Sequence, residues 1–165
     1  MKKITIIITL SIFLTASSFY YAQPKSNFTG TWKINKSKMD FGKAPDYIMP
    51  TTFVIDQQKD KIVVEKISVN QNNEEKKLKE QLLFNGSPFE SGFPDGAKKV
   101  SIIKWNDDGM SFIWSAENKN AEGAVTSKIS DTCTLDDGGK TLIIKRGVEQ
   151  VGQFSYFIKG VYEKQ

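Results

Sequence analysis

Apolar and polar side chains alternate with a period of two along most of this chain. From Gly30 onward the alternation recurs in short runs separated by Asn, Asp and Gly. A period of two places successive side chains on opposite faces of a strand and is typical of antiparallel sheets with one buried face. The pattern predicts nine strands, at 31–35, 52–57, 61–68, 78–84, 98–105, 111–117, 124–135, 141–148 and 153–163.

The turns between these runs indicate how the strands are connected. Asp108–Gly109 and Gly138–Gly139 each lie between two alternating runs. Both pairs suit two-residue primed turns, because such turns require a positive φ that Gly adopts readily. A long meander leaves exposed edges unless it closes on itself. We therefore predict an all-β fold, an antiparallel up-and-down meander closed into a barrel of eight to ten strands, in preference to a sandwich.

The composition excludes much catalytic chemistry. The 165 residues contain no His and one Cys, Cys133. Ser-His-Asp and Cys-His nucleophiles and His-ligated metals are therefore excluded, as are an internal disulfide and a Cys-rich zinc site. We expect a protein that is not an enzyme and that carries no cofactor and no metal. Cys133 itself is expected to be a buried, unreactive thiol.

The N-terminus is organised like a secretory signal peptide, with basic residues, then an apolar run over 4–14, then small and polar residues. Cleavage after Ala22 is favoured, and cleavage after Ser18 is the alternative. An uncleaved anchor stays open as well, because residues 4–22 nearly suffice to span a bilayer. We expect a signal peptide over 1–22, a single barrel domain over 23–165, and export either to the periplasm or out of the cell.

The charges give no indication of a nucleic-acid partner. Lys and Arg number 23 against 19 Asp and Glu, and all the basic residues except Arg146 are lysines scattered along the chain. A nucleic-acid binder would instead gather Lys and Arg on one stripe. We also expect no stable membrane insertion once the signal peptide is removed. The oligomeric state stays open.

Aromatic side chains cluster on one face of the predicted sheet. With Asp108–Gly109 as the turn, Trp105 faces Phe112 and the neighbouring pair includes Trp114. Alternate aromatic positions either fill a core or line a cavity. A barrel of about eight strands has room for one small ligand. The candidate ligand-binding residues are Trp105, Phe112, Trp114, Tyr156 and Arg146.

Arg146 is the one arginine of the chain, and the pattern points it inward. With Gly138–Gly139 as the turn it lies opposite Asp131, the one acid expected inside; a slip of the turn to Asp137–Gly138 would place it opposite Ile129. A buried guanidinium needs partners. Arg146 either binds a ligand carboxylate, helped by Tyr156, or pairs with Asp131 and seals one end of the barrel. The structural role is favoured.

Two segments near the start of the mature chain carry a resemblance to a known family. They are Phe28-Thr29-Gly30-Thr31-Trp32-Lys33-Ile34-Asn35 and Lys36-Ser37-Lys38-Met39-Asp40-Phe41-Gly42. They resemble small secreted bacterial domains of the lipocalin-like (calycin) superfamily. The resemblance implies that Gly30 and Trp32 close the barrel floor and that a basic residue of a late strand packs across Trp32. Arg146, paired with Asp131, is the favoured match, and Lys159 competes. The superfamily's disulfide, second motif and C-terminal helix have no counterpart here.

The expected function is non-catalytic binding of a small hydrophobic or amphipathic ligand inside a lipocalin-like barrel. The alternative is a filled barrel that acts as an envelope or cell-surface module and docks a protein or a glycan. The loop over 39–51 bears on both, because its apolar side chains either stay exposed for docking or fold over the barrel mouth as a lid.

Overall fold

The computed structural model describes residues 25–45, 47–153 and 155–165, and in this part the chain forms one antiparallel sheet. The predicted signal peptide, residues 1–22, and Phe154 lie outside the described residues. The strands are β1 (Gly30–Ile34), β2 (Thr52–Gln57), β3 (Lys61–Val69), β4 (Glu75–Leu83), β5 (Phe89–Gly92), β6 (Lys98–Trp105), β7 (Ser111–Lys119), β8 (Val125–Asp136), β9 (Thr141–Gln150) and β10 (Tyr156–Lys164), with short 3-10 turns η1 (Lys36–Lys38) and η2 (Asp137–Gly139).

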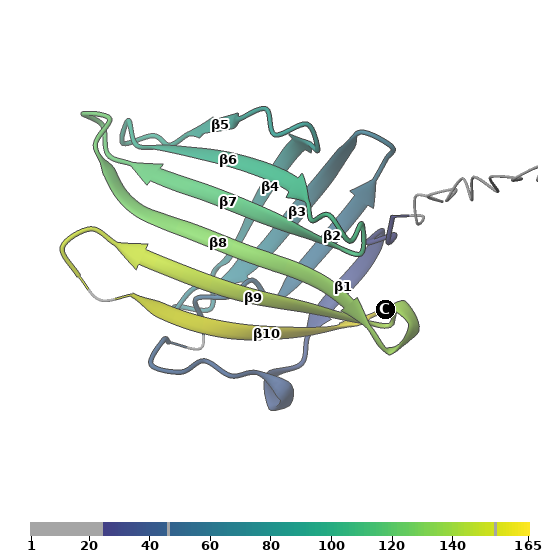
Figure 1. Ribbon diagram of the computed structural model, residues 1–165. Coiled ribbons are helices and arrows are strands. Elements are labelled where there is room, and N and C mark those ends of the chain that lie inside the picture. The colour runs from purple at the N-terminus through teal and green to yellow at the C-terminus, as the bar shows by residue number, and fades with distance from the viewer. Residues whose placement is uncertain (1–24, 46, 154) are drawn as a thin grey trace, which may run out of the picture.

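The sheet curls into a nearly closed barrel. Its strand order is β4-β3-β2-β1-β10-β9-β8-β7-β6-β5, so the first strand pairs with the last. In Figure 1 strands β6 to β10 form the near wall and strands β1 to β4 lie behind them. The predicted all-β meander is confirmed, and the architecture is compatible with a lipocalin-like fold. None of the helices in the described part of the chain has the length and apolar character needed to cross a bilayer.

The count of nine strands is wrong by one. Strand β5 covers only Phe89–Gly92, pairs with β6 and has alternating half-buried and exposed positions. Its sequence, FESG, is too short to show a period of two and contains a Gly, which is depleted in strands. The segment therefore looks like a loop until its partner strand is known.

Both hairpin registers are confirmed, although the turns are longer than predicted. Trp105 pairs with Phe112 and Asp131 with Arg146, which excludes the slipped turn. Five residues, 106–110, connect β6 to β7, and four residues, 137–140, connect β8 to β9, in place of two-residue turns. The hairpin registers are as predicted because the extra loop residues come from the strand ends next to each turn. The residue pairs further from the turn are unchanged.

The two edges of the sheet, β4 and β5, follow each other in the chain. The gap between β4 and β6 is crossed by an isolated backbone bridge between Asn85 and Lys104. It is also crossed by the side chain of Glu80, which reaches Lys99 and Ser101 on β6. We call this gap the seam. At the seam, side-chain contacts help to join the two walls of the barrel, whereas backbone hydrogen bonds join the other neighbouring strands.

Candidate functional site

One end of the barrel interior is packed with aromatic rings. Phe28 lies just before β1 and is fully buried, with its ring centroid 4.6 Å from that of Phe112 and 6.0 Å from that of Trp105. Phe84 stacks on Trp105 at 4.8 Å. Two of the predicted ligand-binding residues, Trp105 and Phe112, thus contact other aromatic side chains. We call this end the aromatic floor.

Trp32 belongs to the same end, and its cation is not the predicted one. Its indole N–H donates to the Phe28 carbonyl at 2.9 Å. The Nζ of Lys164 lies 5.1 Å from the centroid of its ring, because Trp32 and Lys164 pair across β1 and β10. The assignment of this position to Arg146 or Lys159 is therefore corrected to Lys164. Gly30, with φ of +151°, leaves room for this lysine, since a Cβ there would lie 2.6 Å from its Cε.

Arg146 is held by Asp131 further along the interior. Its Nε donates to Oδ1 at 2.8 Å and its Nη2 to Oδ2 at 2.7 Å, and both side chains are buried. Burial acts to lower the pKa of the guanidinium, but the charge and hydrogen bonds of Asp131 outweigh it and the pKa lies above its usual value. The predicted pairing is present, so Asp131 already occupies the bidentate face that a ligand carboxylate would need.

The loop between β1 and β2 packs onto this part of the barrel. Its Ile48 carbonyl accepts a hydrogen bond from Arg146 Nη1 at 3.4 Å, and its Pro50 carbonyl accepts one from the Tyr162 hydroxyl at 2.9 Å. Met49 is 1% exposed and lies against Gly160, where a Cβ would come within 2.8 Å of its Cε. The apolar end of the loop is therefore part of the core, whereas Tyr47 stays exposed.

The structure contains a second set of buried charges, which was not predicted from the sequence. Glu80 on β4 is fully buried, and its carboxylate lies 2.9 Å from Nζ of Lys66 on β3 and 2.9 Å from Nζ of Lys99 on β6. It also accepts a hydrogen bond from the Ser101 hydroxyl at 2.8 Å. The expectation that Asp131 is the one acid inside the barrel is thus wrong. We call Lys66, Glu80, Lys99, Asp131 and Arg146 the charged layer.

The sequence does contain a signal for these residues. Glu80 lies between Leu78 and Leu82 in the alternation of β4, and Lys66 follows Ile62 and Val64 in that of β3. Both occupy the phase that faces the interior. A charged residue in a buried phase is rare unless it is paired, and the pairing partners come from three different strands.

The ring of Trp114 lies against two lysines of the charged layer. Lys66 Nζ lies 3.6 Å and Lys99 Nζ 5.7 Å from the centroid of its ring, close enough for cation–π attraction. Trp114 is 4% exposed, and its indole N–H has no hydrogen-bond partner among the described residues. Tyr156, the remaining predicted ligand-binding residue, is half-buried. Of the predicted ligand-binding residues, Arg146 is part of the charged layer, Trp114 lies beside it, and Trp105 and Phe112 belong to the aromatic floor.

Burial and charge shift the proton affinities of this cluster. Burial is the main cause that lowers the pKa of Lys66 to about 7, followed by the charge of Lys99; Glu80 acts the other way and Arg146 lowers it further. For Glu80 burial acts to raise the pKa, but the two lysines outweigh it and the pKa falls to about 2. Glu80 thus stays ionised over the whole neutral range, whereas Lys66 titrates near neutrality.

This titration predicts a rise in stability with pH. Between about pH 7 and about pH 8.5 the unfolded chain holds a proton on Lys66 that the folded chain has lost, so the free energy of unfolding is expected to increase by up to about 1.4 kcal/mol per pH unit. At higher pH Cys133 and Tyr162, whose folded pKa values are raised by burial, act in the opposite direction. Urea denaturation at several pH values in this window measures the slope. Lys66→Met should abolish it, and a wild-type protein with a flat profile would contradict the assignment.

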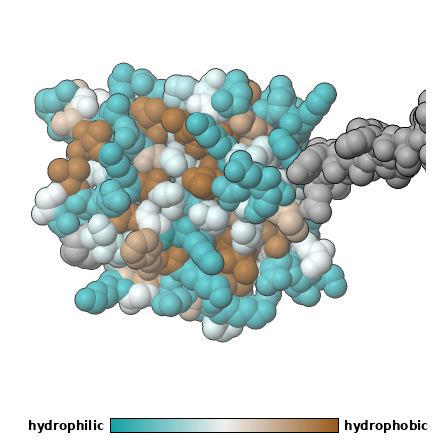
Figure 2. All heavy atoms as spheres, viewed as in Figure 1, coloured by the Kyte–Doolittle hydropathy of each residue, from teal (hydrophilic) through white to brown (hydrophobic). Residues whose placement is uncertain are grey.

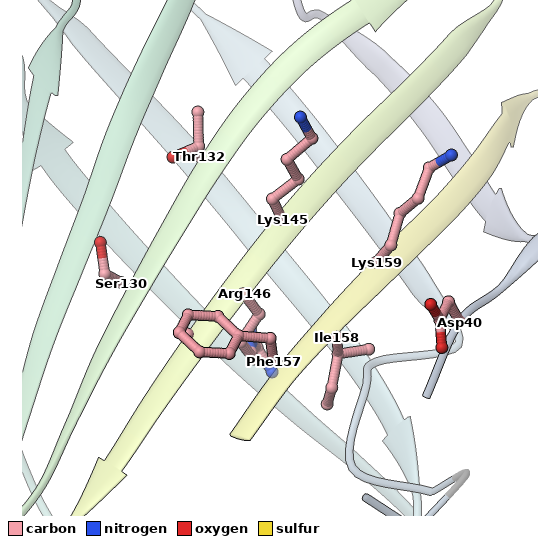
Figure 3. Close-up of a pocket in the computed structure, with 9 residues that line it drawn as sticks. Asp40, Ser130, Thr132, Lys145, Arg146, Phe157, Ile158 and Lys159 are labelled. Carbon is pink, nitrogen blue, oxygen red and sulfur yellow. The ribbon is translucent and has the colours of Figure 1, made fainter. Parts of the chain in front are cut away.

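The outer face of β8, β9 and β10 carries two adjoining grooves, with volumes of about 430 and about 490 Å³. Both are bordered by Ser130, Gly147 and Phe157. Phe157 is 78% exposed, and Figure 3 shows its ring lying across β9 while Lys145 and Lys159 extend away from the strands. Elsewhere on the face seen in Figure 2, hydrophobic residues form small patches separated by hydrophilic ones.

Cys133 is buried inside the barrel, and burial raises the pKa of its thiol well above the usual value, as expected for an unreactive cysteine. Among residues 25–45, 47–153 and 155–165, no group of three or more Cys, Asp and Glu side chains is arranged to hold a metal ion. The sequence matches no protein-family model and no curated protein.

Proposed function

We propose that this protein is an exported, non-catalytic barrel of the lipocalin-like kind that binds a small amphipathic ligand inside, at the charged layer. The observation that carries the proposal is the group of five charged side chains in the interior, two of which, Lys66 and Lys99, lie against the ring of Trp114. A barrel interior that served stability alone would be apolar, because replacing buried ion pairs with well-packed apolar residues is often neutral or stabilising. Groups with shifted pKa values also gather at functional sites.

The two ends of the interior suit different tasks. At the aromatic floor Phe28, Phe84 and Trp105 pack ring against ring, so this end is assigned to structure. Around the charged layer the inward positions of neighbouring strands are small or aliphatic, with Ala116 on β7, Ile129 on β8 and Val148 on β9. Apolar walls with a few polar groups are typical of small-molecule sites. The apolar part of the ligand would lie against these residues and Trp114.

A specific observation favours a second candidate, in which a protein or a glycan docks on the outside. Phe157 is the most exposed of the large hydrophobic side chains among the described residues, and it borders both outer grooves. Exposed aromatic side chains are enriched in binding surfaces. In this reading the barrel is a filled scaffold and the charged layer only closes the seam.

Two neighbouring positions on β7 separate these candidates. Both positions border one of the outer grooves, but the side chain of Ala116 is buried and opposite Ser101, whereas Ser115 is exposed. Titration with Nile red, an uncharged lipophilic fluorophore, is expected to show saturable binding to the wild type. Ala116→Leu should weaken binding about tenfold by occupying the ligand's space, and Ser115→Leu should leave it unchanged. The reverse pattern would favour the outer grooves, and no saturable binding would refute the interior site; circular dichroism checks that each variant is folded.

A further inference from the structure

The charged layer contains more positive than negative side chains. Its three basic residues, Lys66, Lys99 and Arg146, face two acids, Glu80 and Asp131. Arg146 and Asp131 satisfy each other through two short hydrogen bonds. When Lys66 is protonated, the surplus positive charge therefore lies at Glu80, where one carboxylate is shared by two ammonium groups. A buried charge without a counter-charge is costly.

An unpartnered donor lies beside this surplus. The indole N–H of Trp114 is buried without a hydrogen-bond partner among the described residues, and Lys66 Nζ is 3.6 Å from the centroid of the same ring. An indole N–H can only donate, so the group that satisfies it must be an acceptor. A surplus cation and an unpaired donor on neighbouring side chains call for the same partner, an oxygen atom with negative charge.

We propose that the charged layer binds the carboxylate head group of an amphipathic ligand, with Lys66 and Lys99 as its cations and the Trp114 indole N–H as a further donor. This inference rests on the proposed function and specifies the chemical class of its ligand. One carboxylate carries one negative charge and cancels the surplus. The doubly charged form of a phosphate monoester would exceed it.

The proton affinity of Lys66 is consistent with this assignment. Burial and the charge of Lys99 lower its pKa, while Glu80 is the one neighbour that raises it. A second negative charge near Nζ would raise the pKa again, because an opposite charge favours the ionised form. Protonated Lys66 and a bound carboxylate therefore stabilise each other.

A pair of ligands with the same alkyl chain tests the head group. Decanoate and decanol are compared by displacement of Nile red from the mature protein about one pH unit below the pKa of Lys66, where most of this side chain is protonated. We expect decanoate to displace the probe at a concentration at least about tenfold lower than decanol, since hydrogen bonds to charged groups are the stronger ones. The neutral alcohol is the more lipophilic of the two, so hydrophobicity alone predicts the opposite order.

Three variants test which side chains cause the preference for decanoate. Lys66→Met removes the surplus charge, leaves Glu80 paired with Lys99, and should bring decanoate and decanol to similar affinities. Trp114→Phe removes the indole N–H and should weaken decanoate more than decanol. Lys145→Met, at an exposed position on β9 that borders an outer groove, is the matched control and should keep the preference.

The outcomes separate the two proposals. Saturable Nile red binding without a preference for decanoate would overturn the head-group assignment and leave the proposed function standing. A preference that survives in Lys66→Met would overturn the assignment as well, because the carboxylate would then bind elsewhere. Absence of saturable probe binding would overturn both.

Discussion

Replacing Glu80 with glutamine is expected to lower the free energy of unfolding by about 3–5 kcal/mol, because it leaves two lysines without their shared anion in the barrel interior. Glu80 is fully buried and lies 2.9 Å from Nζ of both Lys66 and Lys99. Its contacts with Lys99 and Ser101 also cross the seam between β4 and β6. The substitution should therefore loosen barrel closure in addition to destabilising the fold.

Guanidinium denaturation measures the loss, and amide hydrogen exchange locates it. Exchange should accelerate more in β4 and β6 than in β8 and β9, which are joined by a long backbone ladder. Glu75→Gln is the matched control on the same strand, since the exposed pair of Glu75 with Lys77 contributes about 0–1 kcal/mol. Combining Glu80→Gln with Lys66→Met should recover part of the stability. A Glu80→Gln protein as stable as the control would refute the role assigned to this carboxylate.

Acid provides an independent check on the same side chain. Against the effect of burial, the two neighbouring lysines lower the folded pKa of Glu80 to about 2, from the ordinary carboxyl value of 4.5. A depressed carboxylate pKa stabilises the fold fully above the unfolded pKa, and this stabilisation is lost as the pH falls through the folded value. The difference in stability between the wild type and Glu80→Gln should therefore narrow as the pH is lowered from about 4.5 towards about 2.

Asp131→Asn is expected to destabilise the protein by a similar amount, about 3–5 kcal/mol, because Arg146 keeps its charge when its anionic partner is removed. Arg146 is 8% exposed, and both of its hydrogen bonds shorter than 3 Å go to Asp131. The remaining contact, to the Ile48 carbonyl at 3.4 Å, is too weak to replace them. Loss of the pair should also loosen the loop that carries Ile48.

The same denaturation experiment checks this second prediction. Glu117→Gln, which breaks the more exposed pair of Glu117 with Lys128 at 3.6 Å, serves as the control and should change stability little. Replacing both Asp131 and Arg146 with apolar residues removes both charges, so it should cost far less than Asp131→Asn alone. If the double replacement proved as damaging as the single one, packing and not charge would explain the effect.

Pairings between strands that are close in the chain could be predicted from the sequence. The alternation placed Trp105 opposite Phe112 and Asp131 opposite Arg146, and the structure has both pairs. A hairpin register depends on a few local turn residues and on which face is apolar, and both can be read along the chain. Strand β5 was not predicted, because an alternation of period two cannot be recognised in four residues.

Contacts between distant segments could not be predicted in this way. Lys164 lies over Trp32 because β1 pairs with β10 in one particular register, while the pattern pointed to Arg146 and Lys159. Strand β4 begins with exposed charged residues, yet Glu80 further along the same strand is fully buried. Alternation alone cannot tell whether a charged side chain in the buried phase has a partner.

The sequence alone was sufficient to establish the all-β class, the meander order and the registers of two hairpins, since each follows from side-chain periodicity and neighbouring turn residues. The tertiary structure alone decided which side chains meet across the seam and across the first and last strands. The reason is physical: an inward lysine or glutamate is tolerable only beside a counter-charge, and closure of the barrel is what brings Lys66, Glu80 and Lys99 together from three strands.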